Sequence, residues 1–447
     1  MSVALRPITR QTSASRYGRR SIFGTFLLGF LSLPSAGCEN KSLEPSVVEL
    51  HGAGSTFPAP LYERWFNRMA EEHPGLSIRY DEIGSGSGIR QFIDELVDFA
   101  ASDDPLSDQE IAQVDRGVRQ LPMTSGAIVL AYNLRDANGN PVTDLRLSRK
   151  AYAGIFLGEI RTWLDEEITR YNPKTAFPDL PIQVEYRLDS SGTTSALTRH
   201  LSAINQAWKE GPGIGKMVTW PVGAGMPKSR GVSRGLEQVP GSIGYLSYAY
   251  ARQEGLSMAI LENKAGSFIA PNLNSIQLAL SELDLDISKS RAFLADPLGD
   301  TAYPIVTYSW ILCYRVYEDP SKVGMLKKLF SYGLGEGQEA SEELGYVALI
   351  DPVAQNAKGV LDSISVTSSA DSATAIPVSD SESASGPISQ AVIDTVHKVD
   401  GAENTKTTPE DLSDMKADDA DDVSVKNASE KQGNDTSSSE QPKLGEF

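Results

Sequence analysis

The stretch from Tyr186 to His200, YRLDSSGTTSALTRH, gathers one arginine, one aspartate and a run of glycine, serine and threonine just before a helical pattern. Side chains of these types support two kinds of chemistry. A serine beside a histidine or a carboxylate could act as an activated nucleophile. An arginine and hydroxyl groups at the start of a helix could instead bind an anion. The rest of the chain must distinguish catalysis from anion binding.

Three strand-turn-helix patterns provide the elements that would position such residues. The runs SVVELHGAG, LSIRYDEIGSGSG and IQVEYRLDSSGT each combine a β-like segment with a glycine- or serine-rich turn, and a helical pattern follows each of them. This alternation predicts an α/β protein. The apolar residues that we expect to be buried together on the three helices are Leu61, Trp65, Phe66 and Met69; Ile89, Phe92, Ile93, Leu96 and Val97; and Leu197, Leu201, Ile204 and Trp208.

Each pattern places glycine, serine or threonine at the first turn of its helix. Backbone N–H groups lack helical partners there, and the helix dipole is positive. A single turn of this kind is most often a simple helix cap. Three of them, one beside Arg187, together with the polar turn ASDDPLS after the apolar run LVDFA, indicate convergence on one anionic ligand.

Enzyme motifs are incomplete in this chain. The run GSGSG at 84–88 has glycine where a hydrolase elbow needs serine, and GPGIGKM has Met217 where a P-loop needs serine or threonine to hold magnesium. Four scattered histidines and two distant cysteines make no zinc-ligand pattern. We therefore expect no metal and no cofactor. His200, on the helix after the serine-threonine cluster, is expected to be a solvated or capping residue.

The chain has 447 residues, which is long enough for two ordinary domains and tails, and its formal net charge is −18. An acidic body argues against a nucleic-acid partner, because binding to a phosphate backbone needs a clustered positive field. An anion site in this protein must be built from local, directed donors.

Residues 1–38 resemble an export signal. A positive stretch, RYGRR, precedes an apolar run that is too short for a comfortable membrane span and stops at Cys38. The small residues 35–37 favour a lipoprotein signal with Cys38 as the lipidated residue, although serine replaces the usual leucine three positions before it. A plain cleaved signal is the alternative, and the arginine pair at 19–20 leaves twin-arginine export open. We expect an exported protein of the periplasm or cell surface.

The far end of the chain differs in composition. Residues 366–447 are rich in serine, aspartate and glutamate, so this segment cannot bury enough apolar area to offset its chain entropy, and we expect an acidic disordered tail. Cys313, in the apolar run WILCYRV, is expected to be a buried thiol. With Cys38 lipidated or removed, we expect no disulfide.

Five motifs, in this order, carry a family resemblance: GAGSTFPAPLYERW, GSGSGIRQF, VDFAASDDPLS, YRLDSSGTTSALT and PGSIGYLSYAYA. They resemble the periplasmic phosphate-binding proteins, the substrate-binding components of bacterial ABC-type phosphate uptake systems. The likeness runs from about Leu50 to about Ser365. It implies a two-lobed periplasmic-binding-protein fold (type II), each lobe a mixed central sheet flanked by helices. It also implies a monomer that clamps inorganic phosphate by hinge closure and delivers it to the permease and ATPase of an ABC transporter.

The resemblance implies the phosphate-binding residues one by one. Backbone N–H groups of Thr56 and Phe57, with the threonine hydroxyl, would bind phosphate oxygens, and the fork of Arg187 would match two more. Asp189 would hold Arg187 in place, although the two could also form a purely structural pair. Ser190 departs from the family, which commonly has glycine there. The implied ligand set is Thr56, Phe57, Ser85, Asp103, Arg187, Ser191, Gly192 and Thr193.

Asp103 carries the expectation about specificity. A carboxylate beside an anion repels it unless the anion brings a proton to donate, as phosphate does near neutral pH and sulfate does not. Selection of phosphate over sulfate is therefore expected. The alternative role for Asp103 is a local Asx cap before Pro105.

Two apolar runs, SGAIVLAYNL and YPIVTYSWILCYRV, are suited to cross between the lobes. We therefore expect a first lobe of residues 47–125 plus 306–365 and a second lobe of 126–305, with the site assembled from both on closure. Two other functions stay open. One is a phosphate sensor or surface protein on the same fold. The other is a secreted phosphoester hydrolase that uses Ser191 with His200 or Asp103.

Overall fold

The computed structural model of the protein describes residues 47–282 and 295–367, all of which belong to one compact unit. The proposed export signal with Cys38 lies outside the described residues. So does the predicted acidic tail from residue 368 onward.

A central sheet organises the described chain. Its strands follow the order β2-β1-β3-β12-β4-β8-β6-β7, and β9 also pairs with β4. The sheet is mixed: β3, β12, β4 and β8 pair antiparallel in its middle, and the pairs of β1 with β2 and β3 and of β6 with β7 and β8, toward its two ends, are parallel. The strands are β1 (Val48–Gly54), β2 (Leu76–Glu82), β3 (Phe99–Ser102), β4 (Val118–Asn133), β6 (Gln183–Arg187), β7 (Ala224–Met226), β8 (Ser242–Ser247), β9 (Ser257–Met258) and β12 (Val306–Tyr314).

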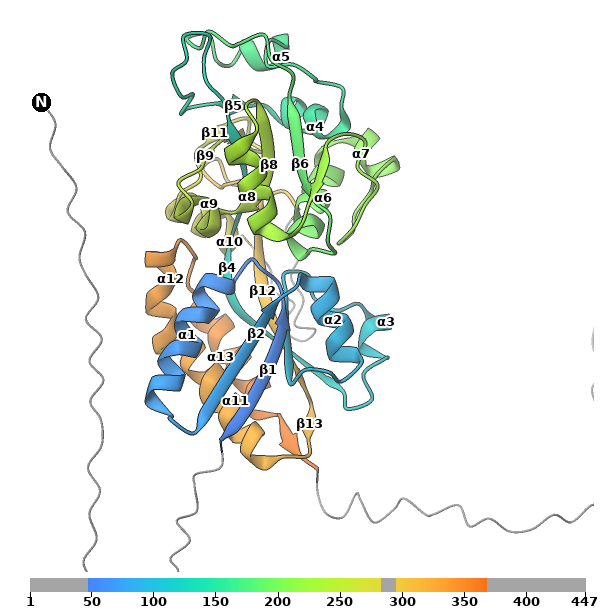
Figure 1. The fold of residues 1–447 in the computed structure, drawn as a ribbon, viewed down its shortest axis with the longest axis vertical. Coiled ribbons are helices and arrows are strands. Elements are labelled where there is room, and N and C mark those ends of the chain that lie inside the picture. Colours follow the sequence, from blue (N-terminus) through green and yellow to red (C-terminus); the bar gives the residue numbers. More distant parts are fainter. Residues whose placement is uncertain (1–46, 283–294, 368–447) are drawn as a thin grey trace, which may run out of the picture. The chain divides into compact units, whose positions relative to one another are not determined.

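The long strand β4 joins the two parts of this sheet. Its residues 118–127 pair with β12, and its residues 128–133 pair with β8. Both β4 and β12 come from the apolar runs noted in the sequence, and every residue of β12 is buried. Figure 1 shows β4 and β12 extending from the elements around β1 and β2 toward those around β6 and β8. The short strands β5 (Arg146–Leu147), β10 (Ile260–Glu262) and β11 (Phe268–Ile269) form a second sheet, and β13 (Val316–Tyr317) pairs with β14 (Ser365–Val366).

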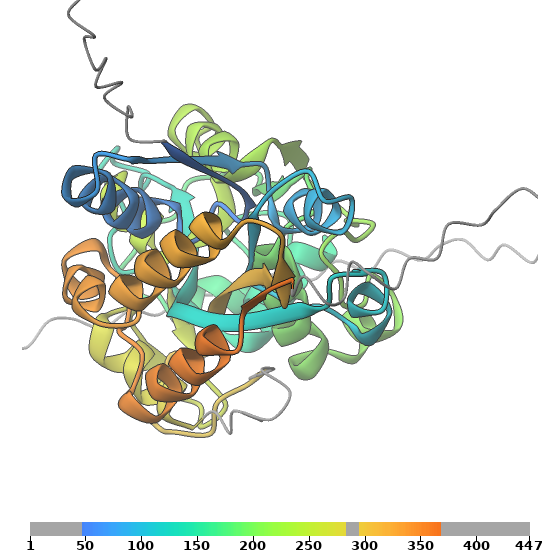
Figure 2. The same cartoon turned by 90° about the horizontal axis from the view of Figure 1, so that it is seen from below.

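Helices cover the sheet. In the part of the sheet around β1, α11 packs against α1 and α13, and α13 lies beside β4 (Figure 2). The helices are α1 (Ala59–Glu72), α2 (Ser85–Ile93), α3 (Asp108–Ile111), α4 (Arg149–Leu157), α5 (Glu166–Thr169), α6 (Gly192–Ile204), α7 (Gln206–Glu210), α8 (Lys228–Gln238), α9 (Tyr248–Gln253), α10 (Leu273–Ser281), α11 (Pro320–Gly333), α12 (Glu339–Leu344) and α13 (Asp351–Asp362).

The predicted apolar faces are confirmed on α1 and for most of α6, where Leu197 and Leu201 are fully buried. Trp208 is also buried, but it lies on α7, beyond the end of α6. On α2 the prediction is wrong for Leu96, because the helix stops at Ile93 and Leu96 is 64% exposed, whereas Val97 is buried as predicted but lies beyond the helix. Glu95 adopts φ 55°, and this left-handed residue turns the chain out of the helix.

Two expectations about single residues have different outcomes. Cys313 is buried, as predicted. The expectation of a solvated or capping His200 is wrong, because the ring is buried and both nitrogens have partners. Nε2 lies 2.9 Å from the Tyr152 hydroxyl, and Nδ1 lies 2.7 Å from the Ala295 carbonyl oxygen. Burial lowers the pKa of His200 to about 4.

This buried histidine predicts a dependence of stability on pH. Its pKa in the folded protein is below the ordinary value of 6.5, so protons favour the unfolded chain. The contribution of His200 is complete above pH 6.5 and is lost as the pH falls toward 4. Between pH 7 and pH 5, the free energy of unfolding should fall by about 2 kcal/mol more in the wild type than in His200→Gln. Urea unfolding at the two pH values measures this difference, and parallel pH profiles would contradict the assignment.

Candidate functional site

The starts of three helices meet at one point of the fold. Thr56 and Phe57 precede α1, Ser85 opens α2, and Gly192 opens α6. The contact between the last two is close, because a Cβ placed on Gly192 would lie 2.7 Å from Ser85 Oγ. The Gly86 amide also donates to the Ser190 carbonyl oxygen at 3.0 Å. First-turn N–H groups and positive helix ends are thereby concentrated around one position.

Asp103 lies at the centre of this arrangement and is 3% exposed. Its carboxylate accepts hydrogen bonds from Ser55 Oγ at 2.7 Å, Ser309 Oγ at 2.9 Å and Thr193 Oγ1 at 3.3 Å. Its backbone amide donates to Ser85 Oγ at 3.4 Å. The carboxylate's partners are hydroxyl groups of other elements in the described chain, which is not the geometry of an Asx cap.

The surroundings of Asp103 make ionisation of its carboxyl group less favourable. Burial raises its pKa to about 6, and the hydrogen bonds from Ser55 and Ser309, the charge of Arg187 and the bond from Thr193 offset part of that rise. Near neutral pH the group is therefore mainly an ionised hydrogen-bond acceptor. A modest fall in pH turns it into a donor.

Arg187 supplies the positive charge of the site, and its side chain is 1% exposed. Nε and Nη2 donate to the two carboxylate oxygens of Asp189, at 2.8 Å and 2.5 Å. Nη1 lies 3.3 Å from Thr56 Oγ1 and 3.2 Å from Ser229 Oγ. Asp189 therefore occupies the Nε and Nη2 side of the guanidinium, while Nη1 and the second Nη2 proton remain as donors. The contact between Arg187 and the anion stays a prediction.

The Asp189 carboxylate is fixed by two neighbours. Besides Arg187, it accepts a hydrogen bond from the Lys228 amide at 2.8 Å. Burial acts to raise its pKa, but the hydrogen bonds and charge of Arg187 and the Lys228 amide outweigh burial and lower the pKa. The two side chains form a neutral pair, so Asp189 orients Arg187 and also balances its charge.

The remaining predicted ligands lie in the same place but differ in what they contact. Thr193 reaches Asp103, as described above. The Phe57 amide donates to Ser55 Oγ at 3.0 Å, and the Ser191 amide donates to the Lys216 carbonyl oxygen at 2.8 Å. Ser191 Oγ accepts from the Thr194 amide at 3.3 Å, as a helix cap does. In this geometry the amides of Phe57 and Ser191 therefore have protein acceptors.

Three serines of the cluster were missed by sequence reasoning. Ser309 lies within the apolar strand β12. Ser229 lies at the start of α8, which is not preceded by a glycine- and serine-rich turn like those of the other motifs. Ser55 stands next to Thr56 in the motif GAGST, and that neighbourhood was its only signal. Ser190, the departure from the family, packs its side chain against Gly86.

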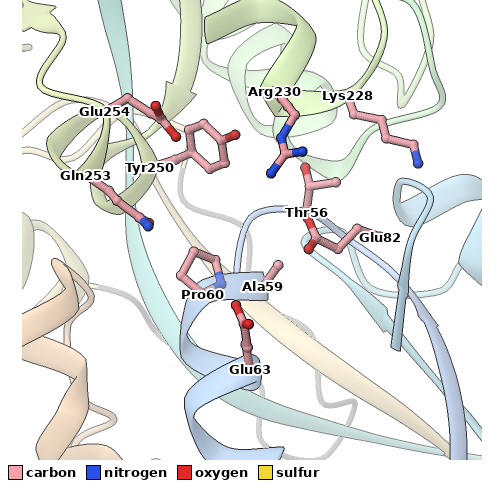
Figure 3. A pocket seen from close by; sticks show the side chains of 10 residues that line it. All are labelled: Thr56, Ala59, Pro60, Glu63, Glu82, Lys228, Arg230, Tyr250, Gln253 and Glu254. Carbon is pink, nitrogen blue, oxygen red and sulfur yellow. The ribbon is translucent and has the colours of Figure 1, made fainter. Parts of the chain in front are cut away.

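A cavity of about 350 Å³ borders the cluster at Thr56 (Figure 3). Lys228 and Arg230 line it from α8, and Glu82 lines it from the end of β2 (Figure 3). Burial raises the pKa of Glu82, and the charges of Arg230 and Lys228 oppose that rise. The complete lining is Thr56, Ala59, Pro60, Glu63, Glu82, Lys228, Arg230, Tyr250, Gln253 and Glu254. Positive and negative charges are mixed along this wall, unlike the hydroxyl-rich cluster around Asp103.

Other kinds of site have no basis in residues 47–282 and 295–367. Within these ranges, no three histidine, cysteine, aspartate or glutamate side chains are grouped so that they could hold a metal ion. In the same ranges, the helices all fall short of the length and hydrophobicity needed to cross a membrane.

Solved structures of known proteins share this fold. A high-affinity periplasmic phosphate-binding protein, PfluDING, solved with bound phosphate, aligns with a TM-score of 0.57 and 19% identity over 70% of this chain and 93% of its own. The phosphate-binding protein of Stenotrophomonas maltophilia aligns with a TM-score of 0.56 and 18% identity over 70% of this chain and 94% of its own. These likenesses confirm the predicted two-lobed periplasmic-binding-protein fold.

Sequence comparisons identify the family. A model of the PBP superfamily domain matches residues 39–335. The phosphate-binding protein PstS of Pasteurella multocida (strain Pm70) is 37% identical over 315 residues, which cover 70% of this chain and 90% of that protein. PstS of Methanocaldococcus jannaschii is 32% identical over 334 residues, covering 70% and 85%. The chain therefore belongs to the PBP superfamily and, within it, to the family of the PstS phosphate-binding proteins.

Proposed function

We propose that this protein binds inorganic phosphate between its two lobes and delivers it to an ABC transporter for uptake. The observation that carries the proposal is the buried Asp103 carboxylate among three helix starts, with Nη1 of Arg187 directed at the adjacent Thr56 hydroxyl. This combination offers many donors and one acceptor. Phosphate that still carries a proton is the common anion with the complementary pattern.

Binding is driven mainly by directed dipoles rather than by net charge. Asp189 balances Arg187, and Asp103 adds a negative charge when it is ionised, so the cluster has no surplus of positive charge. Hydrogen bonds to a charged group contribute about 1.5–3 kcal/mol each. Such donors are Nη1 of Arg187, the first-turn amides of α6 and the hydroxyl pair of Thr56 and Ser229, in which one hydroxyl donates to the other across 2.7 Å; the side chains are buried.

Asp103 would determine which anion is accepted. When the bound anion has no proton, the ionised Asp103 carboxylate accepts no hydrogen bond from it, and two negative charges are in contact. Phosphate donates its proton to this acceptor, and sulfate has none to give near neutral pH. The protein therefore selects phosphate by penalising its closest competitor.

We further propose the lobe division 47–125 plus 306–365 and 126–305. The change of β4 from pairing with β12 to pairing with β8 after residue 127, and the start of β12 at Val306, support it. Under this division Asp103 and Ser85 belong to one lobe, and Thr193 and Arg187 belong to the other. The hydrogen bond from Thr193 to Asp103 then exists only when the lobes close.

The proposal extends to location and partners. We propose an exported, monomeric protein of the periplasm or cell surface, lipid-anchored at Cys38, with residues 366–447 as an acidic tail. Its partners would be the permease and ATPase of the transporter. A plain cleaved signal is the alternative to the anchor, and phosphate sensing on the same fold is the alternative to uptake.

An enzymatic role has less support. For Ser191 to act as a nucleophile, a nearby base must take its proton. Nε2 of His200 contacts the Tyr152 hydroxyl and Nδ1 contacts a carbonyl oxygen, and Asp103 is bonded to three other hydroxyls. We therefore assign the site to binding and not to turnover.

Asp103→Asn tests the function and its specificity together. Isothermal titration of the wild type at pH 8 should give tight one-to-one binding of phosphate and no measurable binding of sulfate. The asparagine amide can donate a hydrogen bond, so the variant should bind sulfate and lose at least about tenfold of its preference for phosphate. Equal binding of both anions by the wild type would contradict the proposal.

The pH offers a control without any substitution. Because the pKa of Asp103 is about 6, the wild type at pH 5 carries a protonated carboxyl that can donate. Sulfate binding should therefore appear in the wild type as the pH falls from 8 to 5. It should change little with pH in Asp103→Asn.

Gly192→Ala tests closure. The added Cβ would lie 2.7 Å from Ser85 Oγ and 2.8 Å from the Asp103 amide nitrogen, so the lobes could not approach fully. We expect phosphate affinity to fall at least about tenfold, with little change in the unfolding of the phosphate-free protein, because alanine suits a helical position. Gly324→Ala, at a site with open space for a Cβ, is the matched control. Unchanged affinity of Gly192→Ala would contradict closure onto this glycine.

A further inference from the structure

A second polar cluster lies next to the anion site and is centred on Asp104. Its carboxylate accepts hydrogen bonds from Ser195 Oγ at 2.9 Å and from Arg199 Nη2 at 3.1 Å. Lys216 Nζ lies 3.8 Å from the same carboxylate, and it donates to Glu110 Oε1 at 3.1 Å. Two acidic and two basic side chains thus form one connected network.

The network joins elements that are distant in the sequence. Asp104 and Glu110 lie just after β3, on the turn of Asp103 and on α3. Ser195 and Arg199 lie on α6, the helix whose start carries Gly192 and Thr193, and Lys216 follows α7. Under the proposed lobe division, every one of these contacts crosses between the lobes. The Asp104 carboxylate contacts none of the residues of the implied phosphate ligand set.

The side chains of the network are largely removed from solvent. Those of Asp104, Lys216 and Arg199 are 16%, 17% and 23% exposed. Exposed ion pairs contribute little, but removing one partner from a partly buried, hydrogen-bonded network leaves the other charges without compensation. The contacts of Asp104 are therefore favourable only while the turn after β3 lies against α6.

We propose that Asp104 is a closure residue, which holds α6 against the turn of Asp103 and so sets the lifetime of the phosphate complex. The proposal rests on phosphate binding by hinge closure. Asp104 need not touch the anion for this role. It changes the equilibrium between open and closed lobes, and the affinity for phosphate depends on that equilibrium.

A direct electrostatic role for Asp104 would have the opposite effect. A negative charge near a bound anion weakens binding, so its removal would tighten the complex. A closure role instead predicts weaker binding when the charge is removed. The sign of the change in affinity therefore distinguishes the two roles.

The test compares full-length wild type, Asp104→Asn and Asp94→Asn. Asp94→Asn is the control, because the same substitution there removes one partner of an exposed ion pair away from α6. In that pair, Asp94 Oδ2 lies 3.7 Å from Arg90 Nε of α2. Stopped-flow measurement with inorganic phosphate should show at least a fivefold faster dissociation for Asp104→Asn and an association rate within about twofold of the wild type. The control should match the wild type in both rates. Urea unfolding without phosphate should be similar in all three proteins.

A double substitution tests the partner. If Asp104 acts through Arg199, the double variant Asp104→Ala/Arg199→Ala should bind phosphate as well as whichever single variant binds it less tightly. The reason is that both substitutions remove the same interaction. Multiplied losses in the double variant would contradict the pairing. Unchanged or slower dissociation from Asp104→Asn, with tight binding by the wild type, would overturn the closure role alone. Failure of the wild type to bind phosphate would overturn the proposed function itself.

Discussion

A carboxylate buried where three helices begin is the constraint on which the site depends. Asp103 would be costly in this position without partners, because burial of a charge is offset only by hydrogen bonds and nearby opposite charge. Ser55 and Ser309 provide part of that compensation from neighbouring elements, and Thr193 provides more from α6. The start of α6 must therefore lie against the turn of Asp103. That approach requires glycine at position 192, where a side chain would collide with Ser85.

The charge balance follows from the same constraint. The charge of the buried Arg187 acts to lower the pKa of Asp103, and Asp189 both orients Arg187 and neutralises it. The outcome is a site with many donors and little net charge, which suits an anion recognised by its hydrogen-bonding pattern. The network around the neighbouring Asp104 also has no net charge, because its two acidic side chains balance its two basic ones. Both sets of interactions join α6 to the turn after β3, so recognition of the anion and closure are expected to be coupled.

Much of this arrangement could be predicted from sequence because glycine, serine and threonine at helix starts have a local physical meaning. The motifs also placed Asp103 and Arg187 in one family site. Ser309 could not be found this way, because one polar residue within the buried strand β12 gives no local signal. The error at Leu96 arose from a helical pattern that continued past a left-handed turn at Glu95. The expectation for His200 was wrong because its partners, Tyr152 and Ala295, are distant in the chain and meet it only in the folded protein.

The most direct test of the central claim is a high-resolution crystal structure of the protein grown with phosphate at neutral pH. We predict one phosphate with an oxygen at hydrogen-bond distance, about 2.5–3.0 Å, from the Asp103 carboxylate. Another oxygen should lie next to Nη1 of Arg187 and the Thr56 hydroxyl. An anion bound instead in the cavity lined by Lys228 and Arg230, with Asp103 still contacting only protein hydroxyls, would contradict the account.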